Sequence, residues 1–337
     1  MKVLVTGGTG FVGREVVRQL TAAAHEVWLW TRAGTVVAVG QPSRLPPSHP
    51  PSRLVAAGKI SETPAGGTPA GTAAGGDASP TTATNLTGFD AIIHLAGIIS
   101  EVGNQTFENV HTRLTKKIVT LAKTTGVKRF LHISALGTRA NATARYHQTK
   151  WAAEEIVRAS GLDWTIFRPS IIYGPGDGFV NLFARLARFS PVVPLIGGGR
   201  TKFQPVSVEN VARCFVAALN EPAARGKVLN LAGEDVLTMR EMVETVLRVT
   251  RRRRLLLPLP FAIARTQAAL AEFCFAKLLR RPPPLNRDQV TMLREDNVSD
   301  THQADELFGL RHEPFAEAIA RYLQQARQAT DPPAGYH

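Results

Sequence analysis

Two sets of residues in this chain have types and spacings that could do chemistry. The first is a glycine-rich turn, in which Gly7, Gly10 and Gly13 follow one apolar run and open another. Between a strand and a helix, such a turn lets the backbone approach a pyrophosphate, which then lies at the helix N-terminus. The alternative is a glycine-rich turn without a ligand. The pattern favours a dinucleotide site formed by Thr6, Gly7, Gly8, Thr9, Gly10, Phe11, Val12 and Gly13.

The second set is Tyr146 and Lys150. Residues four apart on a helix point the same way. A neighbouring ammonium can lower the pKa of a phenol and also bind a sugar hydroxyl. We therefore expect Tyr146 to be a general acid/base with Lys150 as its partner. His147 is expected to point to another face of the helix and to lie at the surface.

The end of the second expected strand bears on the choice between NAD and NADP. An acidic residue there would bind the ribose 2′-hydroxyl, whereas an arginine suits a 2′-phosphate. The chain has Thr31 and Arg32 at this point and no acid nearby. These residues favour NADP(H) over NAD(H). The alternative is that Arg32 is an ordinary surface arginine.

The elements that must position these residues follow an alternating pattern. Short apolar runs alternate with amphipathic ones through the first half, which is typical of a parallel sheet with crossover helices. Strands are expected at 2–6, 26–31, 53–57, 91–95, 130–134 and 164–168, and helices at 11–24 and 146–159. The fold class is therefore α/β, a Rossmann doubly wound parallel sheet followed by a smaller, mainly helical C-terminal substrate lobe.

The domain boundaries follow from this pattern. Residues 1–175 are expected to form the dinucleotide-binding Rossmann domain, interrupted by a low-complexity loop at 61–88 that is rich in Thr, Ala, Gly and Pro. Residues 176–330 are expected to form the smaller substrate or partner lobe, with 205–232 returning to the Rossmann core. Within that lobe, helices are expected at 181–188, 238–249, 261–279 and 315–326, and a strand at 227–231. Residues 331–337 form a tail.

The charge of the chain is uneven. Its 337 residues carry a formal charge of +13, and the stretch 225–294 supplies eight of these charges. The centre of that stretch is Arg251–Arg254, which suits an anionic membrane surface or an electron-transport partner; the alternative is a solvated turn. No motif for nucleic acid accompanies the charge, and the histidines lack metal-ligand spacing.

Cysteine content and hydropathy limit the location. Two cysteines cannot make a disulfide framework, and the longest uncharged apolar run, at 255–264, is too short to span a bilayer. Because the first expected strand begins at Lys2, we expect no signal peptide. We expect a cytoplasmic protein, or one bound peripherally to the inner face of a membrane.

The quoted motifs resemble those of one superfamily. The glycine turn, the segments 94–97, 132–134 and 168–175, and the Tyr146/Lys150 pair resemble the extended and atypical short-chain dehydrogenase/reductases, which are NAD-dependent epimerase/dehydratase-like. The segments at 135–138, 176–183, 204–212 and 285–290 resemble the group typified by the nucleotide-binding accessory subunit of respiratory complex I and its bacterial relatives.

The resemblance implies roles at matching positions. Ser134 would complete the catalytic set beside the nicotinamide, with Tyr146 and Lys150. The further cofactor-binding residues would be Leu95, Ala96, Gly97, Ile133, Lys150, Pro169, Ser170, Ile171 and Ile172. The substrate pocket would lie outside the strand ends, with walls from Ile98, Ile99, Tyr146, Ile172, Phe179 and Phe183. Arg200 could anchor a sugar-nucleotide diphosphate; the alternative is a solvated loop arginine.

Two departures from that superfamily matter. The position that usually holds a catalytic Ser or Thr has Ala135 and Leu136, and Gly58 is followed by Lys59 where an acid usually contacts adenine. Three functions remain. The first is an NADP(H)-dependent oxidoreductase acting on an apolar carbonyl or quinone-related compound. The second is a catalytically weak nucleotide-binding accessory protein that docks on a membrane or respiratory partner. The third is a nucleotide-sugar epimerase or dehydratase.

Overall fold

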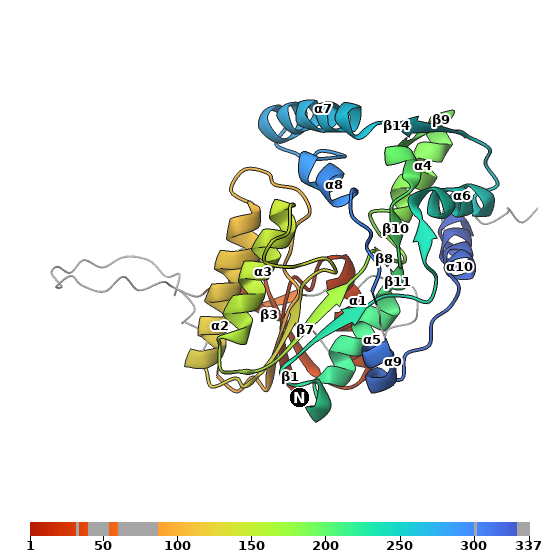
Figure 1. Cartoon of the computed structure of the whole chain (residues 1–337). Helices are drawn as coiled ribbons and strands as arrows, with labels where there is room; N and C mark the ends of the chain where they lie inside the picture. Colours follow the sequence, from red (N-terminus) through yellow and green to blue (C-terminus); the bar gives the residue numbers. More distant parts are fainter. Residues whose placement is uncertain (32–33, 40–53, 60–86, 300–301, 329–337) are drawn as a thin grey trace, which may run out of the picture.

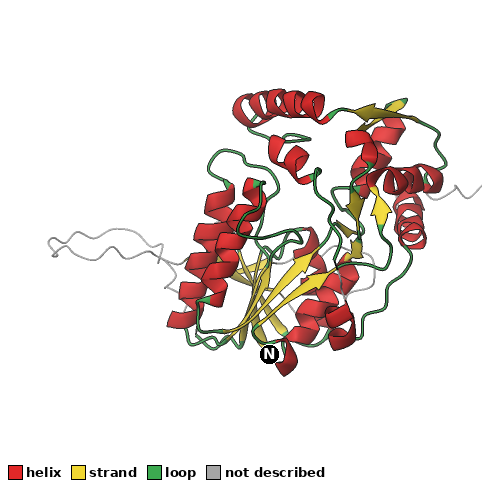
Figure 2. Ribbon diagram, in the orientation of Figure 1, coloured by secondary structure: helices red, strands yellow, loops and turns green. Residues whose placement is uncertain are grey.

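A computed structural model describes residues 1–31, 34–39, 54–59, 87–299 and 302–328; for 54–59, 277–278, 302 and 325–328 only the backbone is described. Figure 1 shows a sheet flanked by helices, with a second group of elements beyond one edge of it. Figure 2 shows that this second lobe holds most of its residues in helices and loops. The α/β fold class with a helical C-terminal region is confirmed.

The large sheet has eight strands in the order β12-β7-β6-β5-β1-β2-β3-β4. Six of them run parallel, from β12 to β2. The strands are β1 (Lys2–Thr6), β2 (Glu26–Trp30), β3 (Thr35–Val39), β4 (Leu54–Lys59), β5 (Ala91–His94), β6 (Arg129–Ile133), β7 (Asp163–Pro169) and β12 (Lys227–Leu231). The central strands are buried on both faces, which explains their continuous Val, Ile and Leu runs.

Helices cover both faces of this sheet. Helices α1 (Phe11–Ala22) and α5 (Val208–Ala218) pack on one face through Val16, Leu20 and Phe215. Helices α2 (Leu114–Thr124) and α3 (Arg145–Arg158) cover the other, where Ile118 and Val157 join a separate core. A π-helix, η1 (Glu108–Arg113), leads into α2. The crossovers therefore bring successive parallel strands to the same edge.

One edge of the sheet differs from the expected pattern. The third strand was expected at 53–57, but β3 lies between it and β2 and runs antiparallel to both β2 and β4. The chain reverses at Gly34, whose φ of 74° is left-handed and whose N–H donates to Thr31 O at 3.1 Å. This turn replaces a crossover helix. The segment 41–52 and most of 61–88 lie outside the described residues.

The second lobe has a core of its own, built from α4 (Val180–Phe189), α6 (Met239–Val249) and α10 (Phe315–Gln328). Thr238 and Glu241 form a capping box at the start of α6, where the sequence predicts a helix over 238–249. The other helical elements are η2 (Gly197–Gly199), η3 (Pro222–Ala224), α7 (Phe261–Ala271), η4 (Glu272–Leu278), α8 (Arg287–Met292) and α9 (His302–Phe308).

Short strands complete this lobe, so that it is more mixed than the sequence suggested. They are β8 (Ile172–Tyr173), β9 (Val192–Ile196), β10 (Lys202–Phe203), β11 (Val206–Ser207), β13 (Leu237–Thr238) and β14 (Leu255–Leu259), paired in three two-stranded sheets. After α5 the chain returns to the large sheet, where β12 pairs with β7. Within the described ranges, no helix combines the length and apolar character needed to cross a membrane.

Candidate functional site

The carboxyl ends of four neighbouring strands bring the predicted residues together. Thr6, His94 and His132 are in register on β1, β5 and β6, and Ile133 is in register with Phe167 on β7. The glycine turn, the segment 95–97, Ser134 and the segment 169–172 follow directly after these strands. The structure therefore gathers them at one edge of the sheet, which is where open α/β sheets bind ligands.

The glycine turn is packed so closely that side chains would not fit. A Cβ on Gly7, whose φ is 71°, would lie 2.8 Å from the backbone of Leu95 and Ala96. A Cβ on Gly13 would lie 2.1 Å from Gly7 O. The Gly10 N–H closes the turn by donating to Gly7 O at 2.9 Å. The turn is therefore held against the end of β5, with backbone rather than side chains at its surface.

The N-terminus of α1 can receive an anion. Gly10 is its N-cap and supplies no side-chain hydrogen bond, and its first turn holds no acidic residue. Unpaired backbone N–H groups and the positive end of the helix dipole suit a pyrophosphate. Thr9 and Gly10 are exposed, and Phe11 and Val12 are half-buried. The backbone geometry of this turn is therefore suited to bind a dinucleotide.

The residues predicted to select NADP lie where β2 turns into β3. Thr31 Oγ1 is hydrogen-bonded to Thr35 Oγ1 at 2.6 Å, which closes this turn. Arg32 lies outside the described residues. The backbone of Lys59 pairs with Thr35 on the sheet edge, and the Lys59 side chain is not described. NADP preference therefore remains a prediction.

Lys150 is buried where β5 and β6 end. Its ammonium donates to Ile133 O at 3.0 Å, and a Cβ on Gly97 would lie 3.3 Å from Nζ. Burial lowers its pKa from 10.5 to about 8. One N–H group of the ammonium is used by the protein, and the cation stands beside two of the predicted cofactor segments.

We expect Lys150→Met to separate stability from function. Burying the ammonium costs free energy below its folded pKa of about 8, and this cost fades as the pH rises from there towards 10.5, because the folded chain loses the proton first. At pH 7 the variant should gain about 1–2 kcal/mol in urea unfolding. Its nucleotide affinity should fall by at least about tenfold. A stability gain that did not shrink near pH 10 would contradict this explanation.

Tyr146 lies among aromatic rings. Phe107, His111 and His147 each present an edge or face to it, with ring centroids 5.8, 5.2 and 5.2 Å away. Burial, and next the charge of Asp288, raise the pKa of Tyr146 to about 12. The expected lowering of this pKa by Lys150 is therefore wrong, because burial and the charge of Asp288 both act in the opposite direction. The phenol stays protonated at neutral pH and makes no hydrogen bond to the described residues.

Helix α3 is fixed to the sheet by a buried carboxylate. Glu154 is fully buried and accepts two hydrogen bonds from Arg168 on β7, at 2.8 and 2.6 Å, and one from Arg158 at 2.5 Å. Both guanidinium groups also lie over the ring of Trp151. Because Tyr146 and Lys150 are on the same helix, this cluster holds them at the strand ends.

Asp288 of the second lobe caps the N-terminus of α3, which no local signal could predict. Its carboxylate accepts hydrogen bonds from the backbone N–H groups of Arg145 and Tyr146 at 2.8 and 2.7 Å. Asn286, the N-cap of α8, donates to Ile99 O and to Ser100 Oγ at 2.8 Å each. The only local sign was the Asn286 and Gln289 spacing of a capping box. The second lobe thus contacts both the N-terminus of α3 and the segment 99–100 that follows β5.

Ser134 is buried and belongs to a chain of hydroxyl groups. Its Oγ donates to Thr138 Oγ1 at 3.4 Å, which lies 3.3 Å from His147 Nδ1. His147 is only 7% exposed, so its expected surface position is wrong. It fits because Gly137 has no side chain: a Cβ there would lie 3.3 Å from the imidazole. Ala135 and Leu136 supply no hydroxyl.

Two further histidines brace the site and were missed by the sequence analysis. His111, on η1, has Nε2 3.1 Å from Ile98 O and Nδ1 3.0 Å from Thr149 Oγ1. His94 links Thr6 Oγ1 to Thr115 Oγ1 at 2.6 and 2.9 Å. Burial lowers the pKa of His111 to about 2 and that of His94 to about 3. Both are therefore neutral structural groups.

The segment after β7 is held by the second lobe. Ser170 Oγ donates to Asn297 Oδ1 at 2.6 Å, and Asn297 Nδ2 donates to Leu136 O at 3.1 Å. Ile172 pairs with Val206 through β8 and β11. Pro169 is buried, and Ile171 and Ile172 are half-buried. The predicted cofactor-binding segment 169–172 is thus hydrogen-bonded to the second lobe through Ser170. Its Ile171 and Ile172 side chains remain partly exposed.

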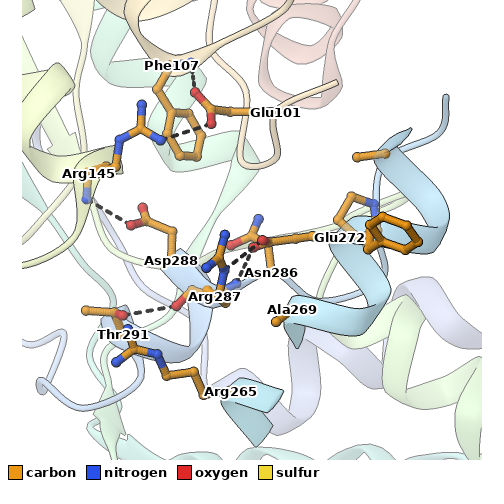
Figure 3. Close-up of a pocket in the computed structure, with 13 residues that line it drawn as sticks. Glu101, Phe107, Arg145, Arg265, Ala269, Glu272, Asn286, Arg287, Asp288 and Thr291 are labelled. Carbon is orange, nitrogen blue, oxygen red and sulfur yellow. Dashed lines mark hydrogen bonds and ion pairs between the residues drawn. The ribbon is translucent and has the colours of Figure 1, made fainter. Parts of the chain in front are cut away.

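A pocket of about 640 Å³ lies between the two lobes, beside Tyr146's neighbour Phe107. Figure 3 shows Arg145 and Asp288 on one side of it and Glu272 with Arg287 on the other. None of the six walls that the sequence predicts lines this pocket. Phe179 and Phe183 pack instead against the second-lobe core, with ring centroids 4.9 Å apart. Ile99 is exposed, as is Arg200. Within the described ranges, no cluster of His, Cys, Asp or Glu could hold a metal ion.

Comparison with family models gives two matches. Residues 3–232 match the NAD dependent epimerase/dehydratase family, and residues 138–328 match the RmlD substrate binding domain. The first match covers every strand of the large sheet and every residue of the candidate site up to β12.

Among curated proteins, the chain is 32% identical over 302 residues to "NADH dehydrogenase [ubiquinone] 1 alpha subcomplex subunit 9, mitochondrial" of Arabidopsis thaliana, covering 88% of this chain and 70% of that protein. Across four relatives of that name, the aligned part is 43–70% of the relative's length. The "Ceramide reductase" of Caulobacter vibrioides is 28% identical over 80% of the chain and 77% of its own length. The "2-alkyl-3-oxoalkanoate reductase" of Stenotrophomonas maltophilia is 26% identical over 85% and 87%.

Solved structures agree on the fold. The structure described as "MoeE5 in complex with UDP-glucose and NAD" superposes with a TM-score of 0.66 at 17% identity, over 98% of this chain and all of that one. At this identity the likeness concerns the fold.

Proposed function

Because this chain belongs to the NAD dependent epimerase/dehydratase family, we propose that it binds a nicotinamide dinucleotide at the glycine turn and reduces the carbonyl group of an apolar or quinone-related compound. The observation that carries the proposal is the placement of Lys150 beside the ends of β5 and β6, with Tyr146 four residues earlier on the same helix, α3. A protonated phenol on the helix face that carries a buried ammonium is suited to reduction of a carbonyl.

The chain's own groups would act as follows. The Tyr146 hydroxyl, whose pKa is about 12, donates its proton to the carbonyl oxygen as the carbon–oxygen π bond opens. Lys150, held by Ile133 O, binds the nicotinamide ribose and balances the negative charge left on the phenol. The reduced nicotinamide, when bound, supplies the hydride that the carbonyl carbon accepts. The hydroxyl groups of Ser134 and Thr138 are hydrogen-bonded to each other, and that of Thr138 also lies 3.3 Å from His147 Nδ1.

An amphiphilic substrate suits the cavity. Its lining combines apolar Phe107, Phe273 and Ala269 with charged side chains such as Arg145, Glu272 and Asp288. Two relatives carry names that state a reductase activity, one on ceramide and one on 2-alkyl-3-oxoalkanoates. Both names describe compounds with alkyl chains, which supports an apolar carbonyl substrate here. The nucleotide-sugar alternative draws on the name of the matched family and on fold likeness, and the names of the two reductase relatives favour a carbonyl substrate over it.

A turnover screen tests this function. The full chain is mixed with NADPH or NADH and a set of 3-oxoacyl compounds of increasing chain length, short ketones and short-chain quinones, and absorbance at the nicotinamide band is followed. We expect oxidation that quickens with alkyl chain length. A chain that binds the nucleotide yet turns over no member of the set would refute the reductase function.

One observation favours a second candidate, a nucleotide-binding accessory protein without rapid turnover. Ala135 and Leu136 lack the hydroxyl that usually polarises the substrate oxygen, and the curated relative with 32% identity is a respiratory-chain subunit by name. For this function, NADPH bound to the purified chain would stay reduced in the presence of the same compounds. The screen therefore separates the two functions directly.

We further propose that NADP(H) is preferred over NAD(H), because Arg32 follows β2 without an acidic neighbour. We expect Arg32→Ala to weaken NADPH binding by roughly tenfold while changing NADH binding less than twofold, since a charged pair with the 2′-phosphate is lost. Titration of intrinsic tryptophan fluorescence with each nucleotide measures this. Equal loss for both nucleotides would place Arg32 outside the phosphate site.

A further inference from the structure

One end of the second lobe carries exposed apolar side chains. They come from the end of α4, from β14 and from α7, and Figure 1 shows α4, β14 and α7 together at the end of the molecule opposite the N-terminus. Phe189 is 80% exposed, and Leu255 and Leu270 are each 64% exposed. We call this set the apolar rim: Phe189, Leu255, Leu257, Ile263 and Leu270.

The rim follows from how these elements pack. Along β14, Leu255 and Leu257 are exposed, whereas Leu256 between them packs against the second-lobe core. Leu255 N donates to Pro191 O at 3.0 Å, which places the start of β14 next to the end of α4 that bears Phe189.

Helix α7 divides its side chains in the same way. Ile263 and Leu270, seven residues apart, share a face that is exposed. Ala264 and Ala268 are fully buried against Val290 of α8. Small residues thus hold the helix down, and its large apolar residues point away from the fold.

Arginines lie before and after the stretch of sequence that carries most of the rim. Arg251–Arg254 precede β14, and Arg280 and Arg281 follow η4. Among the described residues, no carboxylate forms an ion pair with any of these six arginines. Arg188 lies over the Phe189 ring at 5.4 Å, which adds a further cation. Unpaired cations around apolar side chains are the arrangement that anionic lipid surfaces attract.

We propose that the apolar rim and its flanking arginines bind the surface of a membrane that contains anionic phospholipids. The arginines meet the headgroups, and the Leu, Ile and Phe side chains enter the boundary between headgroups and acyl chains. The charge complementarity decides the occupant: an uncharged partner would leave the six arginines without an anionic group, although Arg254 already donates to Ala187 O and Arg253 O. The membrane binding is independent of whether the chain turns over a substrate.

Flotation of the purified full chain with vesicles tests this surface. Vesicles of phosphatidylcholine alone are compared with vesicles that contain about a third phosphatidylglycerol, at low and high salt. Each arginine near such a surface contributes roughly fivefold to partitioning. The charge variant is Arg251→Gly, Arg253→Gln, Arg280→Gly and Arg281→Gln; we expect it to bind anionic vesicles at least about tenfold more weakly. Arg251 and Arg280 have φ of 54° and 50°, so glycine relieves strain there.

Two more variants test whether binding needs this particular surface or only positive charge anywhere on the protein. Leu257→Gln with Leu270→Gln keeps every arginine. This double variant should also reduce binding by at least about tenfold, because two apolar side chains that would enter the membrane are replaced by polar ones. The matched control removes four exposed cations near α2, by Arg113→Gln, Lys116→Gln, Lys123→Gln and Lys128→Gln. It should bind within about threefold of the unmodified chain.

The results decide the matter in either direction. Salt-sensitive binding to anionic vesicles that both rim variants lose and the control keeps supports the proposal. The proposal is overturned if the unmodified chain fails to float with anionic vesicles, if it floats equally with neutral ones, or if the control loses as much binding as the charge variant. Pull-down of a protein partner without vesicle binding would assign the surface to that partner instead.

Discussion

Replacing Tyr146 by phenylalanine is expected to lower kcat on the best carbonyl substrate by at least about a hundredfold, with little change in nucleotide affinity. The reason is that the phenol is the proton donor to the carbonyl oxygen, and loss of a positioned general acid costs about 10²–10⁴ in rate. The ring itself stays, and with it the edge and face contacts to Phe107, His111 and His147. Steady-state oxidation of NADPH at saturating substrate measures the effect.

Tyr173→Phe is the matched control. Tyr173 lies in the second-lobe core against Phe315, with ring centroids 5.2 Å apart, and its hydroxyl makes no hydrogen bond to the described residues. Tyr173→Phe removes a phenol oxygen from a similarly aromatic environment that lies outside the candidate site. Its kcat should stay within about twofold of the unmodified chain. Equal rates for Tyr146→Phe and the control on a good substrate would remove Tyr146 from the reaction.

The sequence predicted those parts of the site whose signals are local. The glycine turn works because each glycine sits where the adjoining strand and helix leave no room for a side chain, and spacing alone reveals this. Tyr146 and Lys150 share a helix face for the same local reason. The capping box of Thr238 and Glu241 likewise needs only neighbouring residues.

The parts that were missed depend on contacts distant in sequence. Asp288 caps α3 from the other lobe, 142 residues after Tyr146. His147 is buried because Gly137 leaves space for its ring, which no helical periodicity reports. The raised pKa of Tyr146 follows from burial and Asp288 together, and neither is visible before the lobes are placed.

The edge of the sheet shows another limit. The run Thr35–Val39 has the β-branched composition of a strand. Its direction, however, depends on the left-handed Gly34 and on the Thr31 to Thr35 hydrogen bond. A tight reversal of this kind overrides the expectation of a crossover helix, and so the strand order at this edge could be found only from the fold.

The glycine turn carries the second large prediction. Gly13→Ala is expected to weaken nucleotide binding by at least about tenfold and to lower the free energy of unfolding by about 1–3 kcal/mol, the usual cost of overpacking. The new Cβ would lie 2.1 Å from Gly7 O and 2.6 Å from Gly8 Cα. Both are backbone atoms of the turn, so no flexible side chain can move aside.

The relief must come from the turn itself. Gly7 O accepts the hydrogen bond from Gly10 N, and the same turn presents its backbone to the pyrophosphate. Pushing Gly7 O away therefore opens the cradle that binds the nucleotide. Gly178→Ala is the control, because nothing lies within 4 Å of its Cβ and its φ is ordinary. That change adds the same methyl group and reduces the conformational entropy of the unfolded chain by the same amount. Nucleotide titration and urea unfolding of both variants give the comparison, and Gly13→Ala that bound as tightly as Gly178→Ala would show that the nucleotide does not approach this turn.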